Sequence, residues 1–274
     1  MAGPAKVAFV LGGGGILGAT QVGMLQALAA EGVRPDLVVG ASVGAVNGAM
    51  LAADPSADSL ERLTELWNSL SRSEVFAGGL IGRARTLARN GTHLHSAAPL
   101  RRLLTANLPA TFAELQVPFQ CVAAGIESAS AHWFDSGPLV EAVLASSAVP
   151  GLLPPVHIGD RHYLDGGLVH SIPVGRAVEL GASTIYVLQV GRVEQPLKPP
   201  RWPWQVGLVA FEIARRHRYL EEMAAVPDGT RVVVLSSGMP DTPLVSLRYR
   251  DTGRVATRIE RAYAASREVL ADAG

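Results

Sequence analysis

One stretch constrains this chain more than any other: a short apolar run followed by Gly40-Ala41-Ser42-Val43-Gly44. Residues 37–39 have the composition of a buried strand, and the small residues at 45–53 predict a helix. A sharp turn between a strand and a helix is the setting in which G-x-S-x-G holds a nucleophilic serine. Such a turn would place the Ser42 hydroxyl at a helix N-terminus, where backbone N–H groups favour negative charge. A structural loop serine between glycines is the alternative that the motif alone leaves open.

A second glycine-rich turn precedes this motif. Residues 6–11 form an apolar run typical of a strand covered on both faces, and residues 19–30 predict a helix. Between them, the N–H groups of Gly13, Gly14 and Gly15 can turn toward one point and form a nest for an anion, given the positive φ values that glycine adopts readily. We expect this loop and Ser42 to lie at the same edge of a parallel sheet.

The same glycines support a different class of function. Residues 13–18 match G-x-G-x-x-G after a strand, which is also the dinucleotide-binding fingerprint. A dinucleotide site would require an acidic residue at the end of the second strand, where Ser42 stands; Glu31 and Asp36 come before that strand. A nucleotide-binding module is therefore the alternative from another class.

The remaining patterns predict a single α/β domain with a central, mostly parallel sheet flanked by helices in three layers, α/β/α. A core at 5–192 would be followed by a helix-strand-helix extension at 193–274, packed on the same domain. The segment at 71–118 is rich in Gly, Ser and Arg and predicts only short helices and loops. The other predicted strands are 119–126, 161–164, 183–190 and 231–235, and the other predicted helices are 58–70, 138–148, 206–225 and 254–270. A further predicted helix follows Ile172-Pro173 and runs through Leu180.

Composition excludes several classes of protein. A formal net charge of zero over 274 residues argues against nucleic-acid binding, and no apolar stretch reaches the ~20 residues of a membrane span. The single cysteine, Cys121, suits a reducing cytoplasm. His93 and His95 lack further ligands, so no metal is expected.

Two surface features bear on membranes. Arg83, Arg85, Arg89, Arg101 and Arg102 lie in a stretch (75–113) without acidic residues, which suits either anionic lipid or a solvated face. Trp202 and Trp204 suit either a lipid headgroup layer or packing of the following helix over the core. We expect peripheral membrane association as one alternative.

The identity of the base is where the predicted site departs from an ordinary Ser-His-Asp triad. Asp165 comes before Gly166 and Gly167, and Asp-Gly-Gly alone is more often simply a turn. At its ordinary pKa near ~3.9, an aspartate is a weak base for a serine hydroxyl compared with histidine near ~6.5. His170 follows five positions later, so an ordinary triad is the alternative. Without a catalytic histidine, we expect no loss of activity near pH 6 to 7 from histidine protonation.

Three separated blocks resemble the patatin-like phospholipase family over residues 5–192. They are Gly13-Gly14-Gly15-Ile16-Leu17-Gly18 with 23–28, then Gly40 to Gly44, then Ala145 to Pro150 with 154–156, Tyr163 to Leu168 and 172–174. The resemblance implies a Ser-Asp dyad, with Ser42 as nucleophile and Asp165 as proton acceptor. It places the oxyanion hole at Gly13, Gly14 and Gly15 and makes Gly18, Gly40, Gly44, Gly166 and Gly167 motif glycines.

The implied function is a serine acyl hydrolase that cleaves lipid acyl esters through an acyl-enzyme, without a cofactor. An acyltransferase or thioesterase with the same dyad is the alternative among enzymes. Leu17 departs from the family, which usually has Arg or Lys there, so we expect ester hydrolysis more firmly than phospholipid as substrate.

Overall fold

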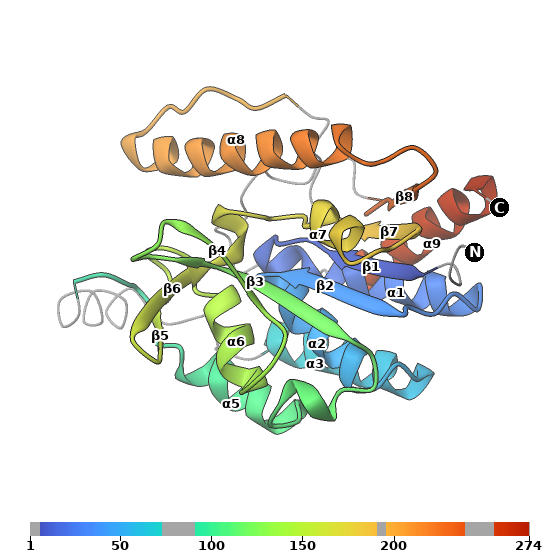
Figure 1. Cartoon of the computed structure of the whole chain (residues 1–274), viewed down its shortest axis with the longest axis horizontal. Coiled ribbons are helices and arrows are strands. Elements are labelled where there is room, and N and C mark those ends of the chain that lie inside the picture. Colours follow the sequence, from blue (N-terminus) through green and yellow to red (C-terminus); the bar gives the residue numbers. More distant parts are fainter. Residues whose placement is uncertain (1–5, 73–90, 191–195, 239–254, 274) are drawn as a thin grey trace.

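The computed structural model describes residues 6–72, 91–190, 196–238 and 255–273. In this part of the chain, one sheet of eight strands lies between two layers of helices (Figure 1). The strands are β1 (Val7–Leu11), β2 (Leu37–Ala41), β3 (Phe119–Gly125), β4 (Ser130–Phe134), β5 (Val156–Ile158), β6 (Arg161–Asp165), β7 (Thr184–Leu188) and β8 (Arg231–Leu235). The α-helices are α1 (Ala19–Ala30), α2 (Val43–Ala53), α3 (Ala57–Arg72), α5 (Ala98–Asn107), α6 (Leu139–Ser146), α7 (Val174–Glu179), α8 (Pro203–Ala224) and α9 (Val255–Ala273), and the 3-10 turns are η1 (Gly15–Gly18), η3 (Phe112–Glu114) and η4 (Gly166–Leu168).

The sheet is mixed but mostly parallel. Strands β3, β2, β1, β7 and β8 lie side by side in that order and run parallel. β2 is buried at all five positions, which accounts for its continuous apolar sequence. β4 and β6 are antiparallel to β3, and β5 is antiparallel to β6. The predicted fold class, an α/β domain with a mostly parallel sheet flanked by helices, is confirmed.

The described helices form two layers, and one layer contains more helices than the other. α1, α2, α3, α5, α6 and α9 lie on one face, and α7 and α8 lie on the other (Figure 1). The larger core includes Met24 and Leu28 of α1 and Ile259 of α9, and the smaller core includes Val174 of α7 and Tyr219 of α8.

The C-terminal part adds to the same sheet. β8 pairs with β7 along its whole length, and α9 packs against α1 so closely that a Cβ at Gly23 would lie 2.1 Å from the Ile259 carbonyl oxygen. A division of the chain at residue 192 stays a prediction.

Two strands, β4 and β5, are absent from the sequence-based expectation. β4 is absent from the predicted elements because its sequence, Ser-Ala-His-Trp-Phe, alternates weakly and its strand is largely half-buried. α5, which has a proline in its first turn, is one of the short helices predicted for the segment at 71–118.

Arg83, Arg85 and Arg89 lie outside the described residues. Within the described ranges, none of the helices combines the length and apolar composition that crossing a membrane requires.

Candidate active site

Ser42 and Asp165 meet because two strands share one edge of β3. β4 pairs along the other edge, so β2 and β6 both lie on this edge, β2 on its first part and β6 on its last part. β2 runs parallel to β3 and β6 runs antiparallel, so their C-terminal ends point toward each other. Ala41 pairs with Val122, and Asp165 pairs with Ala123, the next residue of β3. Two residues 123 positions apart in the chain are thereby brought together.

The turn that carries Ser42 has the strained geometry of a nucleophile elbow. Ser42 has a φ of 55° and a ψ of −126°, a conformation that non-glycine residues rarely adopt. The flanking glycines are required by close backbone approach. A Cβ at Gly44 would lie 2.0 Å from the Leu11 carbonyl oxygen, and a Cβ at Gly40 would lie 2.5 Å from the Gly44 oxygen. The motif therefore packs the start of α2 directly onto β1 and β2.

The two side chains are joined by a short hydrogen bond. The Ser42 Oγ donates to Asp165 Oδ2 at 2.6 Å, and Asp165 Oδ1 accepts from the Gly167 N–H at 2.7 Å. The serine is 7% exposed and the aspartate 2% exposed. A Cβ at Gly166 would lie 2.1 Å from the Val122 carbonyl oxygen, so glycine is needed there for η4 to pack against β3. Asp-Gly-Gly is thus more than a turn: its Gly167 N–H holds one carboxylate oxygen, and Ser42 bonds the other.

The environment of Asp165 changes its acidity. Burial raises the pKa of this carboxyl from 3.8 to about 6, although the hydrogen bonds from Ser42 and Gly167 act in the opposite direction. In the folded protein the pKa of Asp165 therefore lies above the ordinary value near ~3.9. At neutral pH the carboxylate is ionised, and its basicity is close to that of an ordinary histidine.

One segment of chain holds both residues from the side. The Ser146 Oγ accepts from the Ser42 N–H at 3.0 Å, and the Ser147 Oγ donates to the Ser42 carbonyl at 3.2 Å. The Ala148 carbonyl accepts from the Asp165 N–H at 3.0 Å. These serines are not among the predicted site residues. Two adjacent polar residues at the end of an apolar helix were the signal in the sequence that could have indicated their contact with the site.

The glycine loop lies against the elbow, as a Cβ at Gly13 would lie 3.2 Å from the Ser42 Cβ. The Gly13 N–H already donates to the Ser171 carbonyl at 2.8 Å. In the described part of the chain, no residue accepts from the N–H of Gly14 or Gly15. Of these three glycines, only Gly15 has a φ in the left-handed region, at 58°. The loop therefore has two N–H groups that remain available to an anion.

A buried amide network fixes both ends of this loop. The Gln21 Nε2 donates to the Gly12 carbonyl at 2.8 Å, and the Asn47 Nδ2 donates to the Gly18 carbonyl at 3.0 Å. Asn47 Nδ2 also donates to Gln21 Oε1 at 2.8 Å, and its Oδ1 accepts from the Trp67 Nε1 at 3.0 Å. Neither amide side chain is exposed. Neither residue is among the predicted site residues; the signal in the sequence was an amide side chain within each of two apolar helices.

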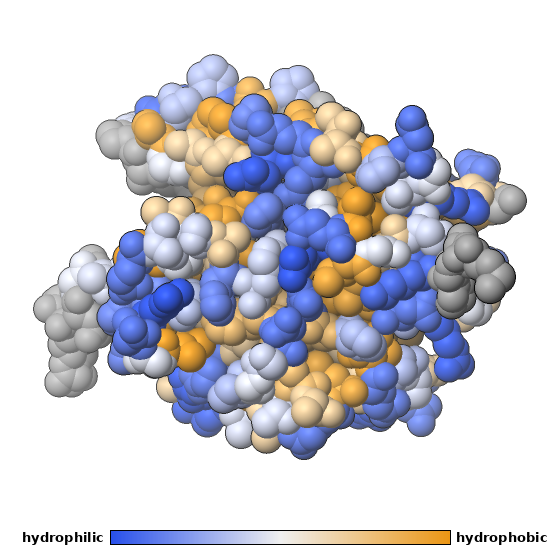
Figure 2. Space-filling view, viewed as in Figure 1, coloured by the Kyte–Doolittle hydropathy of each residue, from blue (hydrophilic) through white to orange (hydrophobic). Residues whose placement is uncertain are grey.

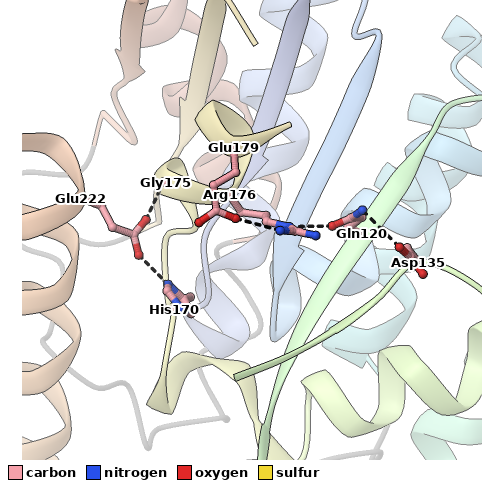
Figure 3. A network of polar contacts seen from close by, with 7 residues as sticks. All are labelled: Gln120, Asp135, His170, Gly175, Arg176, Glu179 and Glu222. Atoms are coloured by element: carbon pink, nitrogen blue, oxygen red, sulfur yellow. Dashed lines mark hydrogen bonds and ion pairs between the residues drawn. The ribbon is translucent and has the colours of Figure 1, made fainter. Parts of the chain in front are cut away.

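His170 is held away from the pair by α8. Its Nδ1 lies 2.6 Å from Glu222 Oε1, and the other oxygen of Glu222 accepts from the Gly175 N–H at 2.7 Å (Figure 3). Among the described residues, neither Ser42 nor Asp165 forms a hydrogen bond with a histidine. The structure thus brings Ser42 and Asp165 together and leaves His170 with Glu222.

The same network continues to the sheet edge. Arg176 donates to Gln120 Oε1 at 2.9 Å (Figure 3). Arg176 also lies over the Trp133 ring at 5.1 Å, and that ring lies 5.3 Å from the His170 ring. It attaches α7 and α8 to the sheet beside the site.

A family model described as patatin-like phospholipase matches residues 9–178, which include the glycine loop, the elbow and the Asp-Gly-Gly turn. The chain belongs to this family. Leu17, where patatin-like proteins usually carry a cation, is 5% exposed and packs in the interior.

Several proteins resemble this patatin-like chain. Lysophospholipase nte1 of Aspergillus terreus is 30% identical over 194 residues, which cover 69% of this chain and 12% of the relative. Patatin-like phospholipase domain-containing protein ZK370.4 of Caenorhabditis elegans is 31% identical over 196 residues, which cover 69% of this chain and 14% of the relative. The chain thus matches only a small part of these much longer proteins. The crystal structure of VipD from Legionella pneumophila is a weak match, with a TM-score of 0.48 and 13% identity over 99% of this chain and 67% of its own.

Proposed function

We propose that this chain is a serine acyl hydrolase in which Ser42 is the nucleophile and Asp165 the general base. The observation that carries the proposal is the 2.6 Å hydrogen bond between the two side chains, in a water-poor site that also raises the pKa of the carboxyl to about 6. A base of this strength can accept the serine proton at neutral pH. Membership of the patatin-like family favours a hydrolase over a nucleotide-binding module.

Acylation begins with attack of the Ser42 Oγ on the ester carbonyl carbon, while its proton moves to Asp165 Oδ2. The N–H groups of Gly14 and Gly15 stabilise the negative charge that forms on the carbonyl oxygen. The Val43 N–H is a third candidate donor, since it is the first of α2 and follows the nucleophile. The Gly13 N–H does not donate to the substrate in this arrangement, because it already donates to the Ser171 carbonyl.

The tetrahedral intermediate then collapses. The bond to the alcohol breaks, and the proton held by Asp165 passes to the leaving alkoxide, which leaves an acyl-serine. In the second half of the reaction, water attacks this ester as Asp165 takes one of its protons. Breakage of the bond to Ser42 releases the carboxylic acid and returns the proton to the serine.

We propose lipid acyl esters as the substrate class. Support comes from the family and from relatives that are named lysophospholipases. Leu17 supplies no charge at the glycine loop, so we assign headgroup selection to other parts of the surface.

A fluorophosphonate probe tests the proposal. The native protein should become covalently labelled at Ser42, identified by mass spectrometry of the peptide, and Ser42→Ala should remove the label without unfolding the protein. Ser130→Ala, at an exposed serine of β4, is the matched control and should label normally. Equal labelling of Ser42→Ala and the native protein would disprove the assignment.

A further inference from the structure

α8 buries charged side chains on the side that faces the sheet and exposes large apolar side chains on the other side. The side turned toward the protein carries Glu212, Arg215, Arg216 and Tyr219, all buried. Arg216 Nε donates to Glu212 at 3.1 Å, and Arg215 lies 3.6 Å from the same carboxylate. The side turned away carries large apolar residues. In a helix that only covers a core, the apolar residues would face inward.

The exposed apolar residues form a continuous stripe, here called the α8 stripe. Trp202, Val206, Ile213 and Leu220 are 62%, 54%, 55% and 59% exposed. They follow each other at intervals of four and seven residues, which places them on one side of the helix. Ala210, His217 and Ala224 share the same side, and Glu221 lies at its border, where its Oε1 is 3.3 Å from His217 Nε2. α8 is the outermost layer of the molecule in Figure 1, and Figure 2 shows apolar surface interspersed with hydrophilic surface over that layer.

We propose that the α8 stripe docks the protein on the surface of an anionic lipid bilayer. Lys198 and Arg201, both exposed, lie at the Trp202 end of the stripe, and Arg218 is exposed on α8 itself. An apolar face with basic residues at its Trp202 end and one acidic residue, Glu221, at its border resembles a helix that lies in the interface between headgroups and acyl chains. A second copy of this chain is a poorer occupant, because four side chains on one convex helix present much less than the ~800 Å² per partner of a stable interface.

The position of α8 connects docking with the active site, and this step rests on the proposed function. Phe211 of α8 approaches η4, since its Cζ would lie 3.2 Å from a Cβ at Gly167, whose N–H is bonded to Asp165. At the other end, Glu222 holds His170 and Gly175. A bilayer against the outer side of α8 would therefore lie one helix away from the turn that carries the base.

Sedimentation with vesicles tests the docking separately from catalysis. The probe is large unilamellar vesicles of phosphatidylcholine with one quarter phosphatidylglycerol, and the protein is the full chain carrying Ser42→Ala, so that no lipid is cleaved. Ile213→Gln with Leu220→Gln should lower the apparent vesicle affinity at least tenfold. Lys198→Gln with Arg201→Gln should lower it several-fold on these vesicles and not on pure phosphatidylcholine.

Tyr263→Gln provides the matched control. Tyr263 is 36% exposed on α9, on the opposite face of the sheet, and its substitution should leave sedimentation unchanged. With Ser42 restored, the α8 variants should hydrolyse a soluble short-chain ester as the native protein does. If that ester is not cleaved by any form, the proposed function fails while the docking result stands. Vesicle binding unaffected by the α8 substitutions, or a dimer in solution that those substitutions dissociate, would overturn the docking proposal.

Discussion

Asp165 is 2% exposed, yet base catalysis requires its carboxylate to be ionised. Two hydrogen bonds, from Ser42 and from the Gly167 N–H, partly replace the lost water. They do not cancel the effect of burial, because the pKa of the carboxyl still lies at about 6. The residue therefore gains basicity, and the folded state is less stable when Asp165 is charged.

This balance gives Asp165 a pH-dependent effect on stability. Because the folded-state pKa is about 6 and the ordinary value is 3.8, the unfolded chain loses this proton at a lower pH than the folded chain. The contribution of Asp165 to stability thus falls as the pH rises from about 4 to about 6, and stays low above that range. The difference between the two pKa values corresponds to about 3 kcal/mol at most.

Asp165→Asn should accordingly raise the free energy of unfolding at pH 8, by up to about 3 kcal/mol, and should have little effect at pH 4. Urea unfolding at both pH values measures this. Asp160→Asn, at an exposed aspartate in the turn before β6, is the control and should change stability little at either pH. An Asp165→Asn protein that is no more stable than the native one at pH 8 would show that the buried charge carries no such penalty.

At the scale of the element, the glycine loop depends on β7 and the residues after it as well as on its own sequence. A Cβ at Gly14 would lie 1.8 Å from Val190 Cγ2, whereas the φ of Gly14, 165°, lies outside the left-handed region. The sequence suggested that positive φ would exclude a side chain at this position. In the structure the obstacle is the packing against Val190, and the positive φ is at Gly15.

Gly14→Ala should therefore displace the loop and lower kcat more than it raises KM, since the loss of one oxyanion donor costs about a hundred- to a thousandfold. Adding Val190→Ala removes the clashing methyl and should restore part of kcat, measured on a soluble ester. A change in KM alone would instead assign the loop to substrate binding. Absence of any restoration in the double variant would mean that Val190 is not the cause.

At the scale of the whole molecule, local sequence patterns predicted most helices and strands. They did not predict which strands pair with one another. The apolar runs that became β1, β2 and β7 were recognisable because these strands are mostly buried: β2 at all five positions, β1 at four of five and β7 at three of five. β4 was not, and without it nothing indicated that β2 and β6 share one edge of β3. That arrangement joins Ser42 to Asp165, and only the family resemblance pointed to it from the sequence.

Two other features required the tertiary structure. Burial of Asp165 sets its basicity, and a side chain's burial depends on residues from distant parts of the chain. Apolar periodicity also does not reveal that the α8 stripe is exposed, because the stripe has helical spacing whether it faces the core or the solvent. Trp202, whose sequence context suited either a lipid headgroup layer or packing over the core, is 62% exposed.

The central claim is that Asp165, and no histidine, is the base for Ser42. The most direct measurement is kcat/KM against pH on one soluble ester, for the native protein, Asp165→Asn and His170→Ala. Asp165→Asn should lose about a hundred- to ten-thousandfold, while His170→Ala should keep most of the activity. Because the pKa of Asp165 is about 6, the native protein and His170→Ala should both lose activity as the pH falls through that value. An acid limb at this pH therefore does not by itself indicate a histidine. If folded His170→Ala were as inactive as Asp165→Asn, a Ser-His-acid triad would replace the dyad.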